Sequence, residues 1–123
     1  MIDFENGFFK LSPVEPKTVA DKVAPLLVEG EEIVAAFKTI RDFVVFTNKR
    51  VISANVQGIT GKKVDYTSLP YSKIQAYSVE TVGTLDLDCE LDLFYSGLGN
   101  VRFELKGNCD IVALSRIISS YIL

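Results

Sequence analysis

The clearest local signal in the chain is Leu85-Asp86-Leu87-Asp88-Cys89-Glu90-Leu91-Asp92-Leu93, in which apolar and acidic residues alternate without a break. Successive side chains of a strand point to opposite faces, so the apolar ones share one face and the four carboxylates share the other. The next run, Val101–Lys106, alternates in the same way and carries two cations. Together the two runs predict a hairpin with a buried face and a polar face, on which cations lie opposite some of the acids.

Outward from this hairpin, the central part of the chain consists of short β-rich runs separated by turn residues. Seven runs at this spacing predict an all-β sandwich or barrel over residues 31–106. The runs are Glu31–Ile40, Asp42–Thr47, Lys49–Val56, Lys62–Ser68, Lys73–Val82, Leu85–Tyr95 and Val101–Lys106.

The two ends of the chain have other patterns. Residues 1–17 contain several aromatic residues and two prolines, which predict an extended arm outside regular structure that packs on its own domain or on a neighbouring subunit. Residues 18–29 predict a short helix that is capped by Thr18 and ended or kinked by Pro25.

Residues 109–123 have the period of an amphipathic helix. An apolar stripe that includes Ile111, Leu114, Ile118, Tyr121 and Ile122 follows a cap from Asn108 or Asp110. Such a helix has to bury its stripe, and we expect it to cover the open end of the barrel.

Composition restricts the class of protein. The 123 residues form one expected domain, 1–123, and the net charge of −3 disfavours nucleic-acid binding. The chain has no histidine, and we interpret Cys89 and Cys109 as structural thiols. We therefore expect no metal, no cofactor and no catalysis. The sequence shows neither a membrane span nor a signal-peptide pattern, so we expect a cytoplasmic protein.

Several motifs resemble those of bacterial pleckstrin-homology-like (PH-like) domains. They occur in the order of that family over roughly residues 26–95, and the terminal helix fits as well. The motifs are Ile40-Arg41-Asp42, Phe46-Thr47-Asn48-Lys49-Arg50-Val51-Ile52, Gly58-Ile59-Thr60-Gly61-Lys62-Lys63, Pro70-Tyr71-Ser72-Lys73-Ile74 and the stretch from Glu80 to Leu91.

The resemblance implies a mainly β fold, a seven-stranded barrel or sandwich of two near-orthogonal antiparallel sheets. A C-terminal helix would cap it and a short helix would precede it. It also implies a homo-oligomeric ring that pairs strands of adjacent protomers, with a pentamer as one candidate size, and a hydrophilic surface near the junction that binds an unknown protein.

The acid row Asp86, Asp88, Glu90 and Asp92 is the main candidate for that surface, together with Arg41, Asp42 and Arg50. A calcium site is disfavoured, because alternate strand residues point in parallel and do not converge on one ion. The row is then either a solvated strand face or a docking strip whose like charges are neutralised by cations. For Arg50 we consider an ion pair with Asp42.

The alternative function is peripheral binding of anionic lipid headgroups through the first hairpin. The candidates are Lys38, Arg41, Lys62 and Lys63. Because the short turn Thr39–Asp42 holds one arginine beside one acid, it lacks the cluster of basic residues that phosphates favour, and we expect lipid to be an unlikely partner.

Overall fold

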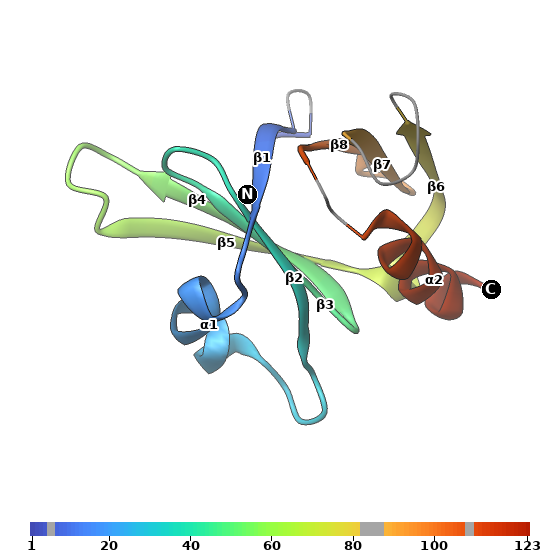
Figure 1. The fold of residues 1–123 in the computed structure, drawn as a ribbon, viewed down its shortest axis with the longest axis horizontal. Coiled ribbons are helices and arrows are strands. Elements are labelled where there is room, and N and C mark those ends of the chain that lie inside the picture. Colours follow the sequence, from blue (N-terminus) through green and yellow to red (C-terminus); the bar gives the residue numbers. More distant parts are fainter. Residues whose placement is uncertain (5–6, 82–87, 108–109) are drawn as a thin grey trace.

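The computed structural model describes residues 1–4, 7–81, 88–107 and 110–123. Eight strands and two α-helices make up most of this part of the chain (Figure 1). In chain order the elements are β1 (Phe8–Val14), α1 (Lys17–Val23), the 3₁₀ turn η1 (Ala24–Leu26), β2 (Ile33–Lys38), β3 (Phe43–Thr47), β4 (Arg50–Gln57), β5 (Lys63–Pro70), the 3₁₀ turn η2 (Tyr71–Lys73), β6 (Ile74–Thr81), β7 (Cys89–Tyr95), β8 (Gly99–Leu105) and α2 (Ile111–Ile122).

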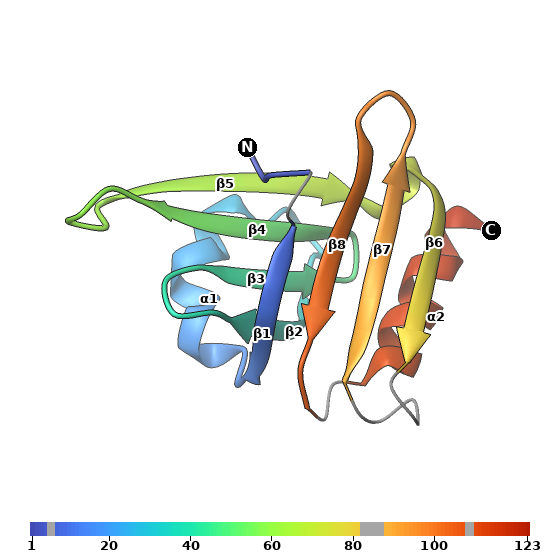
Figure 2. The same ribbon diagram turned by 90° about the horizontal axis from the view of Figure 1, so that it is seen from above.

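The strands form one mixed sheet in the order β5-β4-β3-β2-β1-β8-β7-β6. Strands β6–β8 run across the direction of β2–β5, so that the sheet has two crossed parts (Figure 2). The two parts share β1, whose residues Ser12–Val14 pair antiparallel with β2. Phe8 and Leu11 of the same strand pair parallel with β8. The two crossed layers expected from the sequence are therefore continuous through one strand.

All seven strands predicted within residues 31–106 are present as β2–β8. The seven-stranded count and the all-antiparallel pairing need correction, because the N-terminal arm adds β1 and its parallel pairing with β8. The prolines argued against a strand there. Pro13 is accommodated near the end of β1, and the apolar side chains of Phe8 and Leu11 are buried in the domain's own core.

Strand β1 contains a bulge at Lys10. Between the pairs Phe8↔Phe103 and Leu11↔Leu105, β1 has one residue more than β8. Lys10 has a φ of 55°, a left-handed backbone conformation that residues other than glycine rarely adopt.

The core fills the space between the two crossed parts of the sheet and α2. Phe46 of β3 packs edge-on against Phe103 of β8, with ring centroids 5.9 Å apart. Helix α2 buries Ile111, Leu114 and Ile118 in the same cluster. The predicted cap is confirmed for Asp110, whose carboxylate accepts a hydrogen bond from the N–H of Ala113 at 3.0 Å.

A second, smaller cluster lies under α1. Val19 and Val23 of this helix contact the other face of the layer formed by β2–β5, which we call the first layer and which includes Val45 and Ile52. Strand β3 is consequently buried on both faces. Helix α1 begins at Lys17 rather than after Thr18, and the hydroxyl of Thr18 donates back to the carbonyl of Glu15, so the predicted Thr18 cap is wrong. None of the described helices is long and apolar enough to span a bilayer.

Candidate functional site

The outer face of β6–β8 carries the part of the acid row that the structure describes. Glu90 and Asp92 belong to β7, and Asp88 immediately precedes it, while Asp86 lies outside the described residues. Arg102 of β8 stands opposite Asp92 in the register and donates two hydrogen bonds to its carboxylate, at 2.9 and 3.0 Å. The cross-hairpin pairing expected from the alternation is thereby confirmed.

The other acids of this face share the same two cations. Arg102 also contacts Glu90 at 3.2 Å, and Lys106 contacts both Asp88 at 3.5 Å and Glu104 at 3.2 Å. The hydrogen bonds that Arg102 donates to Asp92 hold the pKa of the guanidinium above its usual range. The N–H of Gly107 donates to Asp88 at 2.6 Å and is the main reason why the pKa of that carboxyl is lowered.

Negative charge remains in excess on this face. Glu80, Glu90 and Glu104 lie opposite one another across β6, β7 and β8. With Asp88 and Asp92, these three make five carboxylates against the cations Arg102 and Lys106. We call these seven side chains the acidic face. Within the part of the chain that the structure describes, no group of three or more acidic or cysteine side chains is placed to hold a metal ion.

Arg50 is not part of the acidic face and lies beside the segment that precedes β2. Its guanidinium donates to both carboxylate oxygens of Glu31, at 2.8 and 3.0 Å, and to the carbonyl of Leu26 at 2.6 Å. It also donates to the hydroxyl of Ser68 at 2.9 Å. Arg50 therefore joins the segment before β2 to strands β4 and β5, and the suggested ion pair with Asp42 is wrong.

Glu31 is the buried partner in this arrangement, and its side chain is fully shielded from solvent. Burial opposes its ionisation, but hydrogen bonds from Arg50, Thr47 and the N–H of Val28 outweigh it and lower the pKa of the carboxyl. Thr47 is itself held by a second buried group, because its carbonyl accepts from the hydroxyl of Tyr71 at 2.7 Å. This cluster is structural, and sequence reasoning missed Glu31 because it is 19 residues from Arg50.

Arg41 and Asp42 connect two neighbouring turns. The carboxylate of Asp42, in the β2–β3 turn, accepts from the N–H of Val56 at 2.8 Å, near the end of β4. Arg41 donates to the carbonyl of Gly58 in the β4–β5 turn. The two turns are thus tied together by side chains that sequence reasoning had placed on an interaction surface.

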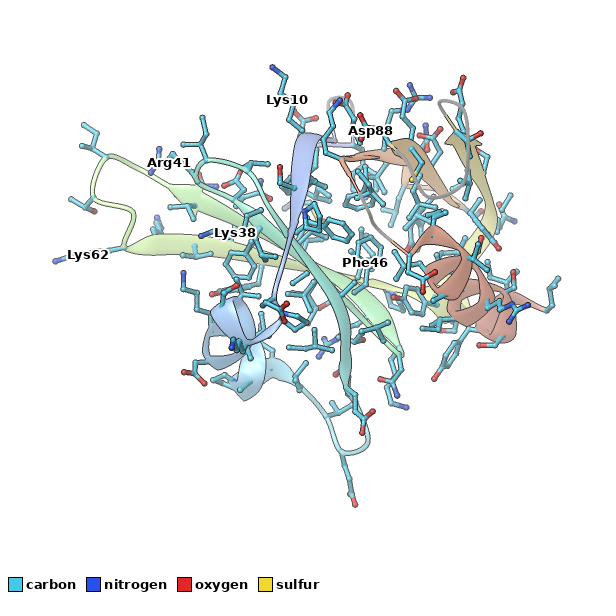
Figure 3. The ribbon with its side chains drawn as sticks, viewed as in Figure 1. Lys10, Lys38, Arg41, Phe46, Lys62 and Asp88 are labelled. Atoms are coloured by element: carbon cyan, nitrogen blue, oxygen red, sulfur yellow. The ribbon has the colours of Figure 1, made fainter. Side chains whose placement is uncertain are left out.

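The four lipid candidates belong to these turns or to the strand ends beside them. Figure 3 shows Lys38, Arg41 and Lys62 on the side of the molecule that is remote from α2. Lys38 ends β2, Arg41 follows it, and Lys62 and Lys63 close the β4–β5 turn. Asp88, which marks the acidic face, lies on the other side of β1 (Figure 3). The structure therefore separates the two groups of candidate residues and brings the basic ones together.

Comparison with known proteins identifies the family. The family profile described as "Bacterial PH domain" matches residues 4–122. The chain belongs to the bacterial PH-domain family. The uncharacterized protein YjqA of Bacillus subtilis (strain 168) is 41% identical over 111 residues, which are 89% of this chain and 89% of YjqA. The uncharacterized protein YozO of the same strain is 30% identical over 116 residues, 94% of this chain and 97% of YozO.

Solved structures agree with this assignment. A DUF1696 family protein with a pleckstrin-homology domain from Shewanella loihica PV-4 is 39% identical, and the match covers 96% of this chain and all of that one, with a TM-score of 0.74. A pleckstrin-homology domain from Shewanella amazonensis SB2B is 43% identical over 93% of each chain, with a TM-score of 0.61. The resemblance found in the sequence and the mainly β PH-like fold are both confirmed. This bacterial PH domain has relatives without a described activity, so its function has to be argued from its own surface.

Proposed function

We propose that this bacterial PH domain is a non-catalytic scaffold that assembles into a ring through its sheet edges and presents the acidic face to a protein partner. The observation that carries the proposal is the outer edge of β6. Within the described chain β6 pairs with β7 alone, and the edge that faces away from β7 has no strand partner. An unpaired row of backbone N–H and C=O groups is a template for adding a strand from another molecule.

The residues of β6 do little to block such pairing. Ile74-Gln75-Ala76-Tyr77-Ser78-Val79-Glu80-Thr81 contains no proline and no lysine, the two residues that most often protect an edge. The opposite edge of the sheet, β5, is partly protected, since it begins at Lys63 and ends at Pro70. Within the described chain β5 pairs with β4 alone, so its outer edge has no strand partner either.

The sheet order supports a ring rather than a two-fold dimer. Strands β5 and β6 are the two ends of one continuous sheet, so each protomer offers two different edges. A contact between the β6 edge of one protomer and the β5 edge of the next is heterologous, and such contacts close into rings when the rotation per subunit allows it.

The acidic face adjoins this edge through Glu80, which is exposed on β6. Arg102 and Lys106 neutralise only part of its charge, so the face favours a partner with a basic surface. In a ring the face would be repeated on every protomer, and repetition strengthens the capture of a partner that has several basic segments.

Native mass spectrometry at physiological salt tests assembly directly. We expect a defined oligomer larger than a dimer, and a clean monomer at micromolar concentration would overturn the ring. Ser78→Pro and Val79→Pro locate the contact. Of two adjacent residues in an antiparallel strand, one has its backbone groups bonded to the neighbouring strand, and the other has them pointing to the opposite side. One of the two variants therefore disturbs the pairing of β6 with β7, and the other disturbs only the outer edge. The variant that keeps the folded monomer should lose the oligomer.

An affinity pulldown from the native cell tests the acidic face. Asp88→Asn combined with Glu90→Gln should leave the monomer folded but reduce partner recovery, and wild-type recovery should fall with added salt. Glu15→Gln combined with Glu29→Gln changes the net charge equally at exposed sites elsewhere and should leave recovery unchanged. Equal recovery with all three proteins would mean that the acidic face is only a solvated surface.

A further inference from the structure

A hollow of about 290 Å³ lies where the β3–β4 turn meets the last turn of α2. It is lined by four segments that are far apart in the sequence, namely the loop before β2, the β3–β4 turn, the junction of β5 with η2, and α2. The β3–β4 turn is at the opposite end of the first layer from the β2–β3 and β4–β5 turns, because antiparallel strands reverse direction at alternate ends. The volume of the hollow is close to the lower limit of ligand pockets, which is about 300 Å³.

The walls of the hollow are joined to one another by contacts within the domain. Arg50 donates to both carboxylate oxygens of Glu31 and so fixes the loop before β2 against β4. The N–H of Tyr71 donates to the carbonyl of Lys49 at 3.1 Å and joins η2 to the β3–β4 turn. The rings of Tyr71 and Tyr121 have centroids 5.9 Å apart, which holds the end of α2 against η2. The hollow is therefore preformed, and a ligand would need little ordering of the protein.

Lys49 provides the uncompensated charge of the hollow. Among the described residues that line it, Glu31 is the one acid, and Arg50 neutralises it through an ion pair of 2.8 Å. The ammonium group of Lys49 has no ion-pair partner in the part of the chain that the structure describes. The hydroxyls of Ser72 and Tyr121 also belong to the lining and are able to donate hydrogen bonds. One positive charge with polar donors beside it favours an anionic ligand.

The rest of the lining is apolar or aromatic. Val28 is 57% exposed and Tyr121 is 41% exposed, so both keep surface that a ligand can cover. Pro70, at the end of β5, adds a third apolar group. Covering these side chains removes apolar surface from water, which favours binding of an apolar molecule. A ligand that matches the whole lining therefore combines one negative group with an apolar body.

We propose that the hollow binds a small organic carboxylate, whose charged group pairs with Lys49 and whose apolar body covers Val28, Pro70 and the ring of Tyr121. A single uncompensated lysine favours a carboxylate over a phosphate, because phosphate recognition favours several basic groups. Folded segments bound the hollow on four sides and its volume is small, which favours a small molecule over the surface of a protein.

The acidic face does not oppose binding of an anion in the hollow. Helix α2 packs on the core side of β6–β8, whereas the acidic face is on the outer side of the same strands. Tyr121 of α2 is therefore on the opposite side of these strands from the five carboxylates. None of the seven side chains of the acidic face lines the hollow, so this proposal is independent of the one made for that face.

Titration of the full chain with phenylacetate, followed by two-dimensional ¹H–¹⁵N NMR, tests the proposal. The amide signals of Lys49, Ser72 and Tyr121 should shift until they saturate, while those of Glu90 and Asp92 on the acidic face stay unchanged. The neutral analogue 2-phenylethanol should bind at least about tenfold more weakly, because it cannot pair with the ammonium group. Phenyl phosphate should bind no more tightly than phenylacetate. Absence of saturable shifts at the hollow, or equal binding of the alcohol, would overturn the proposal, and tighter binding of phenyl phosphate would overturn the choice of a carboxylate.

Two substitutions with matched controls separate the charged and apolar contributions to phenylacetate binding. Lys49→Gln should weaken binding by about tenfold, whereas Lys62→Gln, at the other end of the first layer, should leave it unchanged. Val28→Ser should weaken binding by about threefold, whereas Leu98→Ser on the exposed β7–β8 turn should have no effect. Thermal unfolding verifies that each variant is folded. Equal affinity of the Lys49→Gln and Lys62→Gln proteins would mean that Lys49 does not hold the carboxylate and would rule out the site.

Discussion

Arg50→Met is the substitution that best tests how the domain is held together. It keeps most of the aliphatic length of Arg50 but leaves the shielded carboxylate of Glu31 without a cation. It also removes donors from the carbonyl of Leu26 and the hydroxyl of Ser68. Breaking a buried ion pair by removing one partner costs about 3–5 kcal/mol, and because the Arg50 side chain keeps 20% exposure we expect about 3 kcal/mol.

Urea denaturation followed by far-UV circular dichroism measures this loss. The matched control is Arg116→Met, since Arg116 is exposed on α2 and the same replacement there should change the free energy of unfolding by less than about 0.5 kcal/mol. A loss below about 1 kcal/mol for Arg50→Met would refute the structural role that we assign to the Arg50–Glu31 pair.

The same variant should respond to pH with a definite sign. In the wild type the folded-state pKa of Glu31 is lowered, so its stabilisation is present above the unfolded pKa and is lost as the pH falls through the folded value. In Arg50→Met, burial without the cation should raise the pKa of Glu31, so protonation relieves part of the cost. The stability difference between the two proteins should therefore shrink between about pH 7 and pH 4. A constant difference would mean that the carboxylate is not the group under strain.

Two further substitutions test the packing and the backbone. Ile118→Ala removes a fully buried side chain of α2 and should cost about 3 kcal/mol in chemical denaturation, whereas Val112→Ala on the exposed side of α2 should cost less than about 0.5 kcal/mol; a similar small effect at both positions would mean that α2 does not close the core. Lys10→Gly should raise the free energy of unfolding by about 0.5–1 kcal/mol, because glycine tolerates the positive φ of the β1 bulge. Lys10→Ala keeps the steric penalty and should show no such gain, so equal stability of the two variants would rule out backbone strain at this bulge.

Local periodicity accounts for what could be predicted from the sequence. The seven central strands and the buried stripe of α2 follow from side-chain directions that repeat every two or 3.6 residues. The pairing of Asp92 with Arg102 was also within reach, because a hairpin with a short turn restricts the register of its two strands. The strand β1 was not, since Pro13 argued against it locally and only its position between β2 and β8 provides it with partners on both sides.

Sequence periodicity was thus sufficient for the seven central strands, the terminal helix, their buried faces and the charge pattern of the β7–β8 hairpin. Which distant groups meet became visible only in the folded structure. Arg50 binds Glu31, 19 residues away, and Arg41 reaches Gly58, 17 residues away. These contacts depend on strand order and on the crossing of the two parts of the sheet. Neither has a local signature, because contacts between residues distant in the chain depend on how the whole fold packs.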